Sequence, residues 1–238
     1  MSRDEATGSV VVVMGALSGI GEATALAFAQ RGDVVVISDR HDDTGERLAR
    51  YLKAVGATDA LFVAADVRFE REIADVIDTT MSCFGRLDIA VNNSGTEGSP
   101  APIVELGATQ YAETFGSNVL GTLLSMKHEL RVMQRQGSGV VINVASHFGD
   151  QGVPKSALYT ASESAIIGLA RAAATEAAPF GVRVHAIGPE YDADAITARI
   201  AGSPDNHSAA ANIISHDRAT TTGKMVDAIV HLGGTRAT

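Results

Sequence analysis

The sequence predicts an α/β fold in which a doubly wound parallel sheet is flanked by helices, and three observations support this prediction. Short runs of β-branched residues alternate along the chain with longer segments rich in alanine and leucine. The β-branched runs are apolar throughout, which is typical of parallel strands that are covered on both faces. Glycine follows four of the helical segments, at the position where a left-handed backbone conformation ends a helix. Such alternation places the helices in right-handed crossovers between parallel strands.

The expected strands are short apolar runs that are bounded by polar or glycine-containing segments. They are Val10–Met14, Val34–Ser38, Leu61–Ala64, Ile89–Val91, Val140–Val144 and Val182–Ile187. The expected helices lie near residues 20–31, 43–55, 69–84, 107–134, 158–178 and 224–232. The four helix-ending glycines are Gly32, Gly56, Gly85 and Gly181. Since no Pro- or Gly-rich linker and no internal repeat divides the chain, residues 1–238 are predicted to form one domain.

Composition and charge exclude several classes of function. The 238 residues include 19 lysines and arginines against 28 aspartates and glutamates, and the net charge of −9 disfavours nucleic acid or an anionic membrane as a partner. The single cysteine, Cys83, excludes an intramolecular disulfide framework, and the seven histidines show no metal-ligand spacing, so no metal site is predicted. No apolar run is long enough for a membrane span, and the first residues are polar. We therefore expect a soluble, cytoplasmic, globular protein.

A glycine-rich loop, Gly15–Gly21, joins the first expected strand to the first expected helix. Glycines let the backbone approach a pyrophosphate closely, and the helix N-terminus adds free N–H groups and a positive dipole. An acidic residue, Asp39, closes the second strand, where its carboxylate can bind the adenosine ribose diol and repel a 2′-phosphate. The pattern predicts a Rossmann-type site that prefers NAD, and the neighbouring Arg40 keeps NADP as the less favoured alternative. The loop residues expected at the pyrophosphate are Gly15, Ser18, Gly19, Ile20 and Gly21.

The sequence resembles the short-chain dehydrogenase/reductase family from about residue 8 to about residue 232. The TGxxxGxG loop of the family is matched at its three glycines, with Met14 in place of the threonine. Further motifs follow in the order that the family has them: Asp66-Val67, Asn92-Asn93-Ser94-Gly95, Asn118, and Ser146 with Tyr159 thirteen residues later. Within the family, the sequence is most similar to the glucose 1-dehydrogenase-like branch.

The resemblance implies an NAD-dependent oxidoreductase that acts on a small secondary alcohol or ketone. In such an enzyme Ser146 would polarise the substrate oxygen, Tyr159 would exchange the proton, and Asn118 would support a water relay. Further cofactor contacts are implied for Asp66, Val67, Asn92, Gly95 and Pro189.

The lysine of the family's YxxxK motif is absent, because Glu163 stands one helical turn after Tyr159. Residues at i and i+4 share a helix face, so Glu163 is expected to fill the space of the lysine head and to belong to the catalytic group. A carboxylate there is expected to raise the pKa of Tyr159 and to impair the family's chemistry, and Glu163→Lys would then raise activity. The nicotinamide side departs further from the family at His185, Glu190 and Asp194.

These departures leave two alternatives open beside an oxidoreductase with modified or impaired catalysis. One is a catalytically silent homologue that binds a dinucleotide and acts by association. The other is a non-redox lyase or cyclase that uses Tyr159 and Glu163 as acid and base. The chain also ends soon after its last expected helix, where the family continues into a strand, so the C-terminal strand is expected to be missing. A homodimer through the helices near 107–134 and 158–178 is therefore expected, with a tetramer as the alternative.

Overall fold

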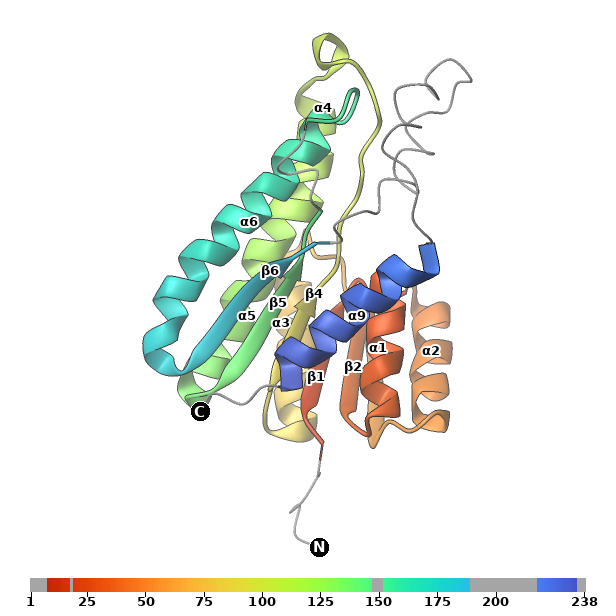
Figure 1. The fold of residues 1–238 in the computed structure, drawn as a ribbon. Coiled ribbons are helices and arrows are strands. Elements are labelled where there is room, and N and C mark those ends of the chain that lie inside the picture. Colours follow the sequence, from red (N-terminus) through yellow and green to blue (C-terminus); the bar gives the residue numbers. More distant parts are fainter. Residues whose placement is uncertain (1–7, 18, 147–151, 189–217, 235–238) are drawn as a thin grey trace, which may run out of the picture.

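The computed structural model describes residues 8–17, 19–146, 152–188 and 218–234. Over these residues the chain forms a parallel sheet of six strands in the order β3-β2-β1-β4-β5-β6 (Figure 1). The strands are β1 (Val10–Met14), β2 (Val34–Asp39), β3 (Asp59–Ala64), β4 (Ile89–Asn92), β5 (Gly139–Val144) and β6 (Val182–Ile187). Every predicted strand is present and every pairing is parallel, so the predicted α/β fold is confirmed.

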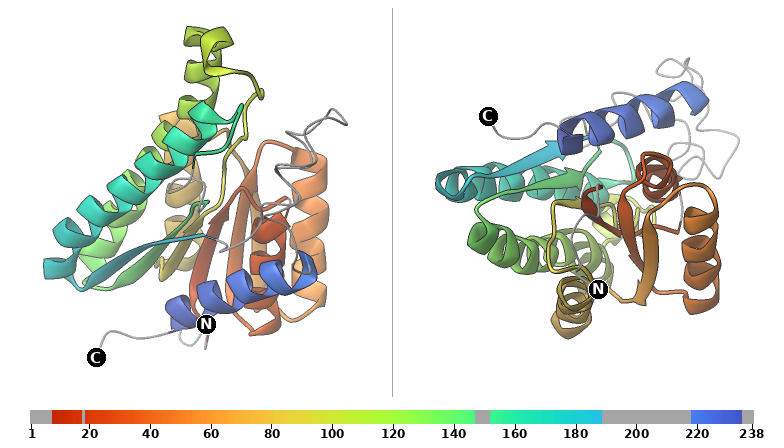
Figure 2. Two further views of the ribbon diagram at one scale, coloured as in Figure 1. Left: turned by 45° about the horizontal axis from the view of Figure 1, so that its top comes forward. Right: turned by 90° about the horizontal axis from the view of Figure 1, so that it is seen from below.

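Helices cover both faces of this sheet (Figure 2). They are α1 (Gly19–Gln30), α2 (Asp42–Ala54), α3 (Glu70–Phe84), α4 (Ala108–Phe115), α5 (Gly121–Gln136), α6 (Ala157–Ala177) and α9 (Arg218–Gly234). Helices α1, α2 and α9 pack on one face, and α3, α5 and α6 pack on the other. Among the helices of the described ranges, none has the length and apolar character that would let it cross a membrane.

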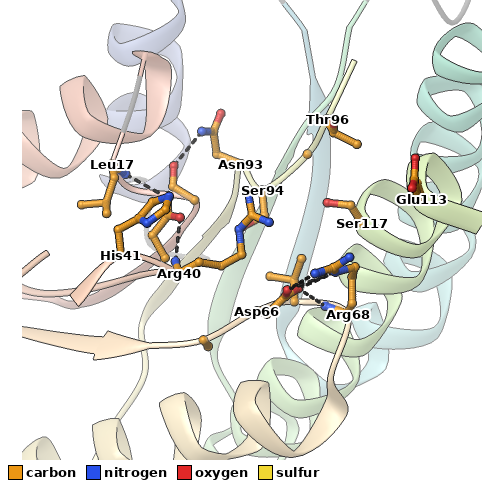
Figure 3. Close-up of a pocket in the computed structure, with 15 residues that line it drawn as sticks. Leu17, Arg40, His41, Asp66, Arg68, Asn93, Ser94, Thr96, Glu113 and Ser117 are labelled. Atoms are coloured by element: carbon orange, nitrogen blue, oxygen red, sulfur yellow. Dashed lines mark hydrogen bonds and ion pairs between the residues drawn. The ribbon is translucent and has the colours of Figure 1, made fainter. Parts of the chain in front are cut away.

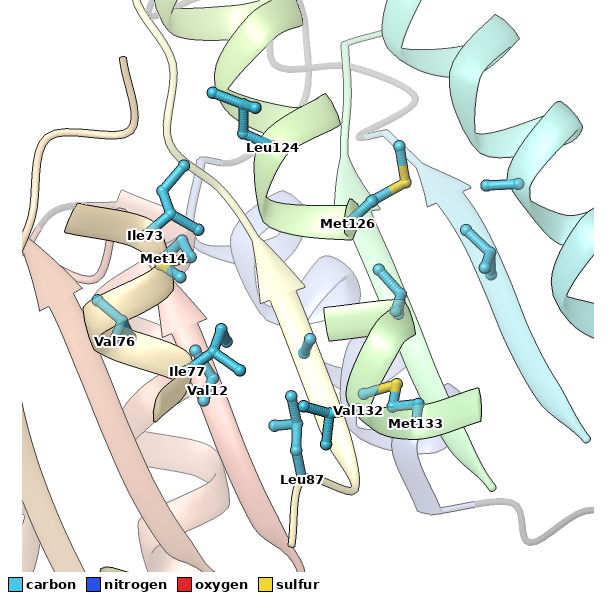
Figure 4. Close-up of a cluster of buried hydrophobic side chains, with 14 of the residues drawn as sticks. Val12, Met14, Ile73, Val76, Ile77, Leu87, Leu124, Met126, Val132 and Met133 are labelled. Atoms are coloured by element: carbon cyan, nitrogen blue, oxygen red, sulfur yellow. The ribbon is translucent and has the colours of Figure 1, made fainter. Parts of the chain in front are cut away.

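Strand β1 lies at the centre of the sheet and supplies side chains to the core on both faces. Its side chains alternate, so Val12 and Met14 join the cluster beneath α3 and α5 (Figure 4). Val11 and Val13 join the cluster beneath α1 and α9. All four side chains are fully buried. Because burial of each contributes about 2 kcal/mol, a strand with valine on both faces requires helices on both sides of the sheet.

The order of the strands reverses between β1 and β4, and this reversal determines where a ligand can bind. From β1 the chain builds outward to β2 and β3, and it then returns to the other side of β1 as β4, β5 and β6. The carboxyl ends of β1 and β4 lie side by side, with Met14 opposite Asn92. In doubly wound sheets, ligands bind in the crevice outside the strand ends at such a reversal.

The structure differs from the sequence-based expectation in one of the helices. The helix expected near 107–134 is interrupted between α4 and α5 by a π-type turn, Gly116–Leu120. This turn contains the buried Asn118, whose amide bonds to backbone outside the helix and thereby accounts for the local widening. Strand β5 ends at Val144, the last residue of the expected strand, and Ser146 follows two residues later. The expected absence of a C-terminal strand concerns residues 235–238, which lie outside the described residues.

Candidate functional site

The glycine-rich loop after β1 packs against the loop after β4. Gly15 has a φ angle of +72°, and a Cβ atom there would lie 2.6 Å from the backbone nitrogen of Ser94. A Cβ atom at Gly21 would overlap the carbonyl oxygen of Gly15, so neither position accepts a side chain. Asn93 Nδ2 donates a hydrogen bond to the same carbonyl oxygen at 2.9 Å. The result is a cradle of backbone at the start of α1, which suits a phosphate group.

Asp39 ends β2 beside this cradle. Its Oδ2 accepts a hydrogen bond from the backbone N–H of Leu17 at 3.2 Å, and its Oδ1 accepts one from the N–H of Arg40 at 2.7 Å. These two bonds hold the carboxylate in one orientation at the edge of the pocket. A carboxylate fixed there can accept hydrogen bonds from the hydroxyls of a ribose.

Asp66 follows β3 and forms an ion pair with Arg68. Arg68 Nε lies 3.0 Å from both carboxylate oxygens, and the backbone N–H of Arg68 donates to Oδ1, also at 3.0 Å. Hydrogen bonding to this guanidinium lowers the pKa of Asp66, so the carboxylate is charged at neutral pH. Glu72 Oε2 accepts the backbone N–H of Asp66 at 2.8 Å and fixes the turn.

These loops surround a pocket of about 540 Å³ at the reversal of the sheet (Figure 3). Six residues that were predicted to bind the cofactor line it: Gly15, Asp39, Arg40, Asp66, Val67 and Gly95. Nine further residues also line it: Leu17, His41, Ala65, Arg68, Asn93, Ser94, Thr96, Glu113 and Ser117. The wall therefore offers carboxylates, guanidinium groups and backbone amides within one cavity, which suits the polar groups of a dinucleotide.

The other described residues that were predicted to bind the cofactor, Gly19, Ile20, Gly21 and Asn92, are not among those that line the pocket. The segment Gly19–Gly21 forms the first turn of α1 and does not line the pocket. Asn92 is buried at the end of β4, directly before the loop that lines the pocket, and its side chain bonds to other core residues. Ser18 and Pro189 lie outside the described residues, as do Glu190 and Asp194.

A core polar cluster of Asn92, Glu129 and Asn143 joins β4, α5 and β5. Asn92 Nδ2 donates to Glu129 Oε2 and to Asn143 Oδ1, each at 3.0 Å. Glu129 is fully buried, which raises its pKa to about 7, and its Oε1 has no hydrogen-bond partner within the described part of the chain. Asn143 Nδ2 also donates to the carbonyl oxygen of His185 at 3.3 Å. Burial lowers the pKa of His185, and the charge of Arg183 adds to this effect, so the region favours neutral groups.

Asn118 links the loop after β4 to α6. Its Oδ1 accepts the backbone N–H of Thr96 at 2.7 Å, and its Nδ2 donates to the Thr96 carbonyl oxygen and to Ser162 Oγ, each at 2.9 Å. Ser162 Oγ in turn donates to the carbonyl oxygen of Tyr159 at 2.8 Å. The structure therefore connects two of the predicted catalytic residues, Asn118 and Tyr159, through one hydroxyl group.

The other two predicted catalytic residues, Glu163 and Ser146, are joined by a hydrogen bond. Glu163 lies one turn after Tyr159 on α6, and its side chain is buried. Its Oε2 accepts the backbone N–H of Ser146 at 2.6 Å. Burial raises the pKa of Glu163 to about 7, and the hydrogen bond from Ser146 opposes that shift. The carboxyl group is thus directed to the segment after β5, a partner that helical spacing alone did not predict.

Several side chains of the site were not predicted, although the sequence contains a pattern that points to two of them. Arg68 stands two residues after a strand-end aspartate, a spacing at which a guanidinium can fold back onto the carboxylate. Glu129 interrupts the apolar face that Met126 and Met133 form at helical spacing, and this position indicates burial. Glu113 reaches the pocket from α4 through tertiary packing, and no pattern in the sequence points to it.

Comparisons with known proteins point to one family. A family model described as short chain dehydrogenase matches residues 9–201. An uncharacterized oxidoreductase of Thermotoga maritima is 36% identical over 199 residues, which cover 83% of this chain and 78% of that protein. Cis-4-hydroxycyclohexanecarboxylate dehydrogenase of Sinomonas cyclohexanicum is 39% identical over 195 residues, which cover 82% of this chain and 76% of that protein.

Solved structures show the same fold. NAD+-bound xylitol dehydrogenase has a TM-score of 0.82 at 27% identity and covers 96% of this chain and 93% of its own. ElxO with NADP bound has a TM-score of 0.82 at 28% identity and covers 95% of this chain and 92% of its own. Structures similar to this chain therefore include examples with either dinucleotide.

Proposed function

Because this chain belongs to the short chain dehydrogenase family, we propose that it is an NAD-dependent oxidoreductase that acts on a small secondary alcohol or ketone, with catalysis modified at Glu163. The pocket at the sheet reversal carries this proposal, since its backbone cradle and fixed carboxylates fit a dinucleotide. Similarity to dehydrogenases of cis-4-hydroxycyclohexanecarboxylate and of xylitol supports an alcohol as the substrate class. The resemblance to the glucose 1-dehydrogenase-like branch agrees with that class.

A bound nicotinamide would supply the hydride acceptor or donor, and the residues of the pocket would hold its adenosine end. At Gly15 the loop packs so closely on Ser94 that only glycine fits, and its backbone would lie against the pyrophosphate. Asp39 would accept hydrogen bonds from the adenosine ribose and repel a 2′-phosphate, which favours NAD. Arg40 and Arg68 also line the pocket and could pair with such a phosphate, so NADP is the weaker ligand that we expect.

The substrate oxygen would be bound by Ser146, and Tyr159 would exchange a proton with it. Asn118 would help to position Tyr159, because its amide bonds both to the backbone of Thr96 and to Ser162 on α6. No ammonium stands at position 163 to stabilise a phenolate, so we expect slower turnover than in relatives that keep the lysine.

A non-redox lyase or cyclase is the second candidate, because the raised pKa of Glu163 suits a general acid or base. A carboxyl group whose pKa is raised to about 7 can donate and accept a proton at neutral pH. A silent homologue that binds a dinucleotide without turnover is the third candidate, and it would keep the pocket intact.

Nucleotide binding and turnover together distinguish these three functions. Titration calorimetry is expected to give tighter binding of NAD than of NADP, by about 10-fold or more. NADH formation is expected with at least one member of a panel of secondary alcohols. For variants that remove the charge of Asp39, the matched control is Asp43→Asn, an exposed change in the first turn of α2. Binding without turnover would support the silent homologue, redox-neutral conversion would support the lyase, and absence of any nucleotide binding would contradict the proposal.

A further inference from the structure

Glu163 joins the helix that carries Tyr159 to the segment that carries Ser146. Its Oε2 lies 2.6 Å from the backbone nitrogen of Ser146, and only 5% of the residue is exposed. Tyr159 and Glu163 are one turn apart on the same face of α6. The carboxyl group of Glu163 therefore links the backbone of Ser146, the expected substrate-binding residue, to the helix that carries Tyr159, the expected proton donor.

The N–H group of Ser146 needs an acceptor because of where the neighbouring strand ends. Successive N–H groups of a strand point to opposite sides, and the N–H of Ala145 donates a hydrogen bond to the carbonyl oxygen of Ile187, the last residue of β6, at 2.7 Å. By this alternation the next N–H group, that of Ser146, is directed away from β6. Strand β4 ends at Asn92, which lies opposite Asn143, so Ser146 lies beyond its last paired residue. The carboxyl group of Glu163 satisfies this buried donor.

We propose that Glu163 is a positioning residue, which fixes Ser146 relative to Tyr159 by accepting the backbone N–H of Ser146. The inference rests on the proposed function in that Ser146 and Tyr159 act on the substrate. The role requires an acceptor oxygen at position 163 and does not require a charge. A lysine lacks an acceptor, so Glu163→Lys removes the anchor instead of restoring activity, which reverses the expectation from the sequence.

The bond survives protonation of the carboxyl group. Burial favours the neutral form of Glu163, and the carbonyl oxygen of a neutral carboxyl group still accepts a hydrogen bond. Oε1 makes no hydrogen bond to any described residue, so Ser146 N–H is the partner that orients the group. A glutamine has the same shape as the neutral carboxyl group and also offers a carbonyl oxygen, which makes Glu163→Gln the conservative variant.

The test compares Glu163→Gln with Glu163→Met, which has similar length but no comparable acceptor. We expect Glu163→Gln to keep kcat within about 3-fold of the wild type, and Glu163→Met to lower kcat about 100-fold with little change in KM or in NAD affinity. Glu163→Lys is expected to behave like Glu163→Met. Glu176→Met, at an exposed position of the same helix, is the control for the substitution itself. Equal loss in the Gln and Met variants, or wild-type kcat in the Met variant, would overturn the proposal.

Amide hydrogen exchange of Ser146, followed by NMR, gives a second measurement that does not depend on turnover. The Ser146 amide is expected to be protected in the wild type and in Glu163→Gln, and to exchange at least about 10-fold faster in Glu163→Met. If the wild type binds NAD but turns over no alcohol, the proposed function fails while exchange still tests the anchor. Equal protection in all three proteins would refute the anchor, whatever the activity.

Discussion

Replacement of Glu129 by glutamine is expected to make the protein more stable, and increasingly so as the pH rises. Glu129 is fully buried, and its one hydrogen bond comes from Asn92 Nδ2. Burial raises its pKa from the ordinary value of 4.5 to about 7, so the folded state holds the proton more tightly than the unfolded state does. Stability is therefore highest when the group is protonated in both states, and it falls as the pH rises from 4.5 towards 7.

The size of the effect follows from this shift of the pKa. Each unit corresponds to about 1.36 kcal/mol, so the full shift lowers the free energy of unfolding by about 3 kcal/mol above pH 7. The loss amounts to about 1 kcal/mol near pH 5 and about 3 kcal/mol near pH 7.5. Glu129→Gln removes the titration and keeps a carbonyl oxygen for Asn92 Nδ2. Any pH-independent effect of the amide shifts both values equally, so the difference of about 2 kcal/mol between the two pH values is the quantity to measure.

Urea unfolding of the wild type and of Glu129→Gln, at several pH values between about 5 and 7.5, measures this difference. Glu163 is also buried with its pKa raised to about 7, and it adds a loss of the same sign to both proteins, so the comparison cancels it. Glu176→Gln, an exposed change on α6, is the control and is expected to leave the pH dependence unaltered. A stability difference between wild type and Glu129→Gln that stays constant across this range would refute the argument, because it would show that Glu129 titrates as an ordinary carboxyl group.

Three further predictions concern the pocket and the assembly. Asp39→Ser is expected to weaken NAD binding about 10-fold and to reduce the preference over NADP in calorimetry, since it removes the acceptor for the ribose; an unchanged preference would contradict that role. Gly21→Ala is expected to abolish NAD binding and lower Tm by several degrees, because its Cβ would overlap Gly15, whereas Gly223→Ala has open space and serves as the control. In light scattering the wild type is expected to be a homodimer and Leu123→Glu a monomer, because Leu123 is 44% exposed on α5; the same mass for both proteins would contradict an interface at this position.

The fold could be predicted from the sequence because its determinants are local. A run such as Val10–Met14 is apolar on both faces, and such a run is stable only inside a covered parallel sheet. The interruption before α5 was not predicted, because it depends on where the Asn118 amide finds partners. Those partners, at Thr96 and Ser162, are distant in the sequence.

The part of the pocket around Gly15 and Asp39 was more predictable than the rest for a related reason. Gly15 and Asp39 belong to a strand–loop–helix unit in which sequence order fixes spatial order, so both line the pocket as expected. Glu113 lines the pocket only because of how α4 packs in the folded chain. The hydrogen bond from Asn92 to Glu129 likewise depends on how α5 packs against the sheet. Helical periodicity can show that Glu129 faces inward, but it does not show which polar group it meets there.

At position 163 the proposed positioning role and the family motif predict opposite effects of Glu163→Lys. Spacing places Glu163 on the face of Tyr159, but the direction of its carboxyl group depends on the Ser146 N–H, which donates a hydrogen bond to it from the segment after β5. A buried N–H group without an acceptor costs about 1–3 kcal/mol. Burial raises the pKa of Glu163 and so favours its neutral form, whose carbonyl oxygen still accepts that bond. The surroundings of position 163 therefore favour a side chain with an acceptor oxygen. A lysine there would leave the Ser146 N–H in need of another acceptor, and its ammonium group would need a polar partner or access to water.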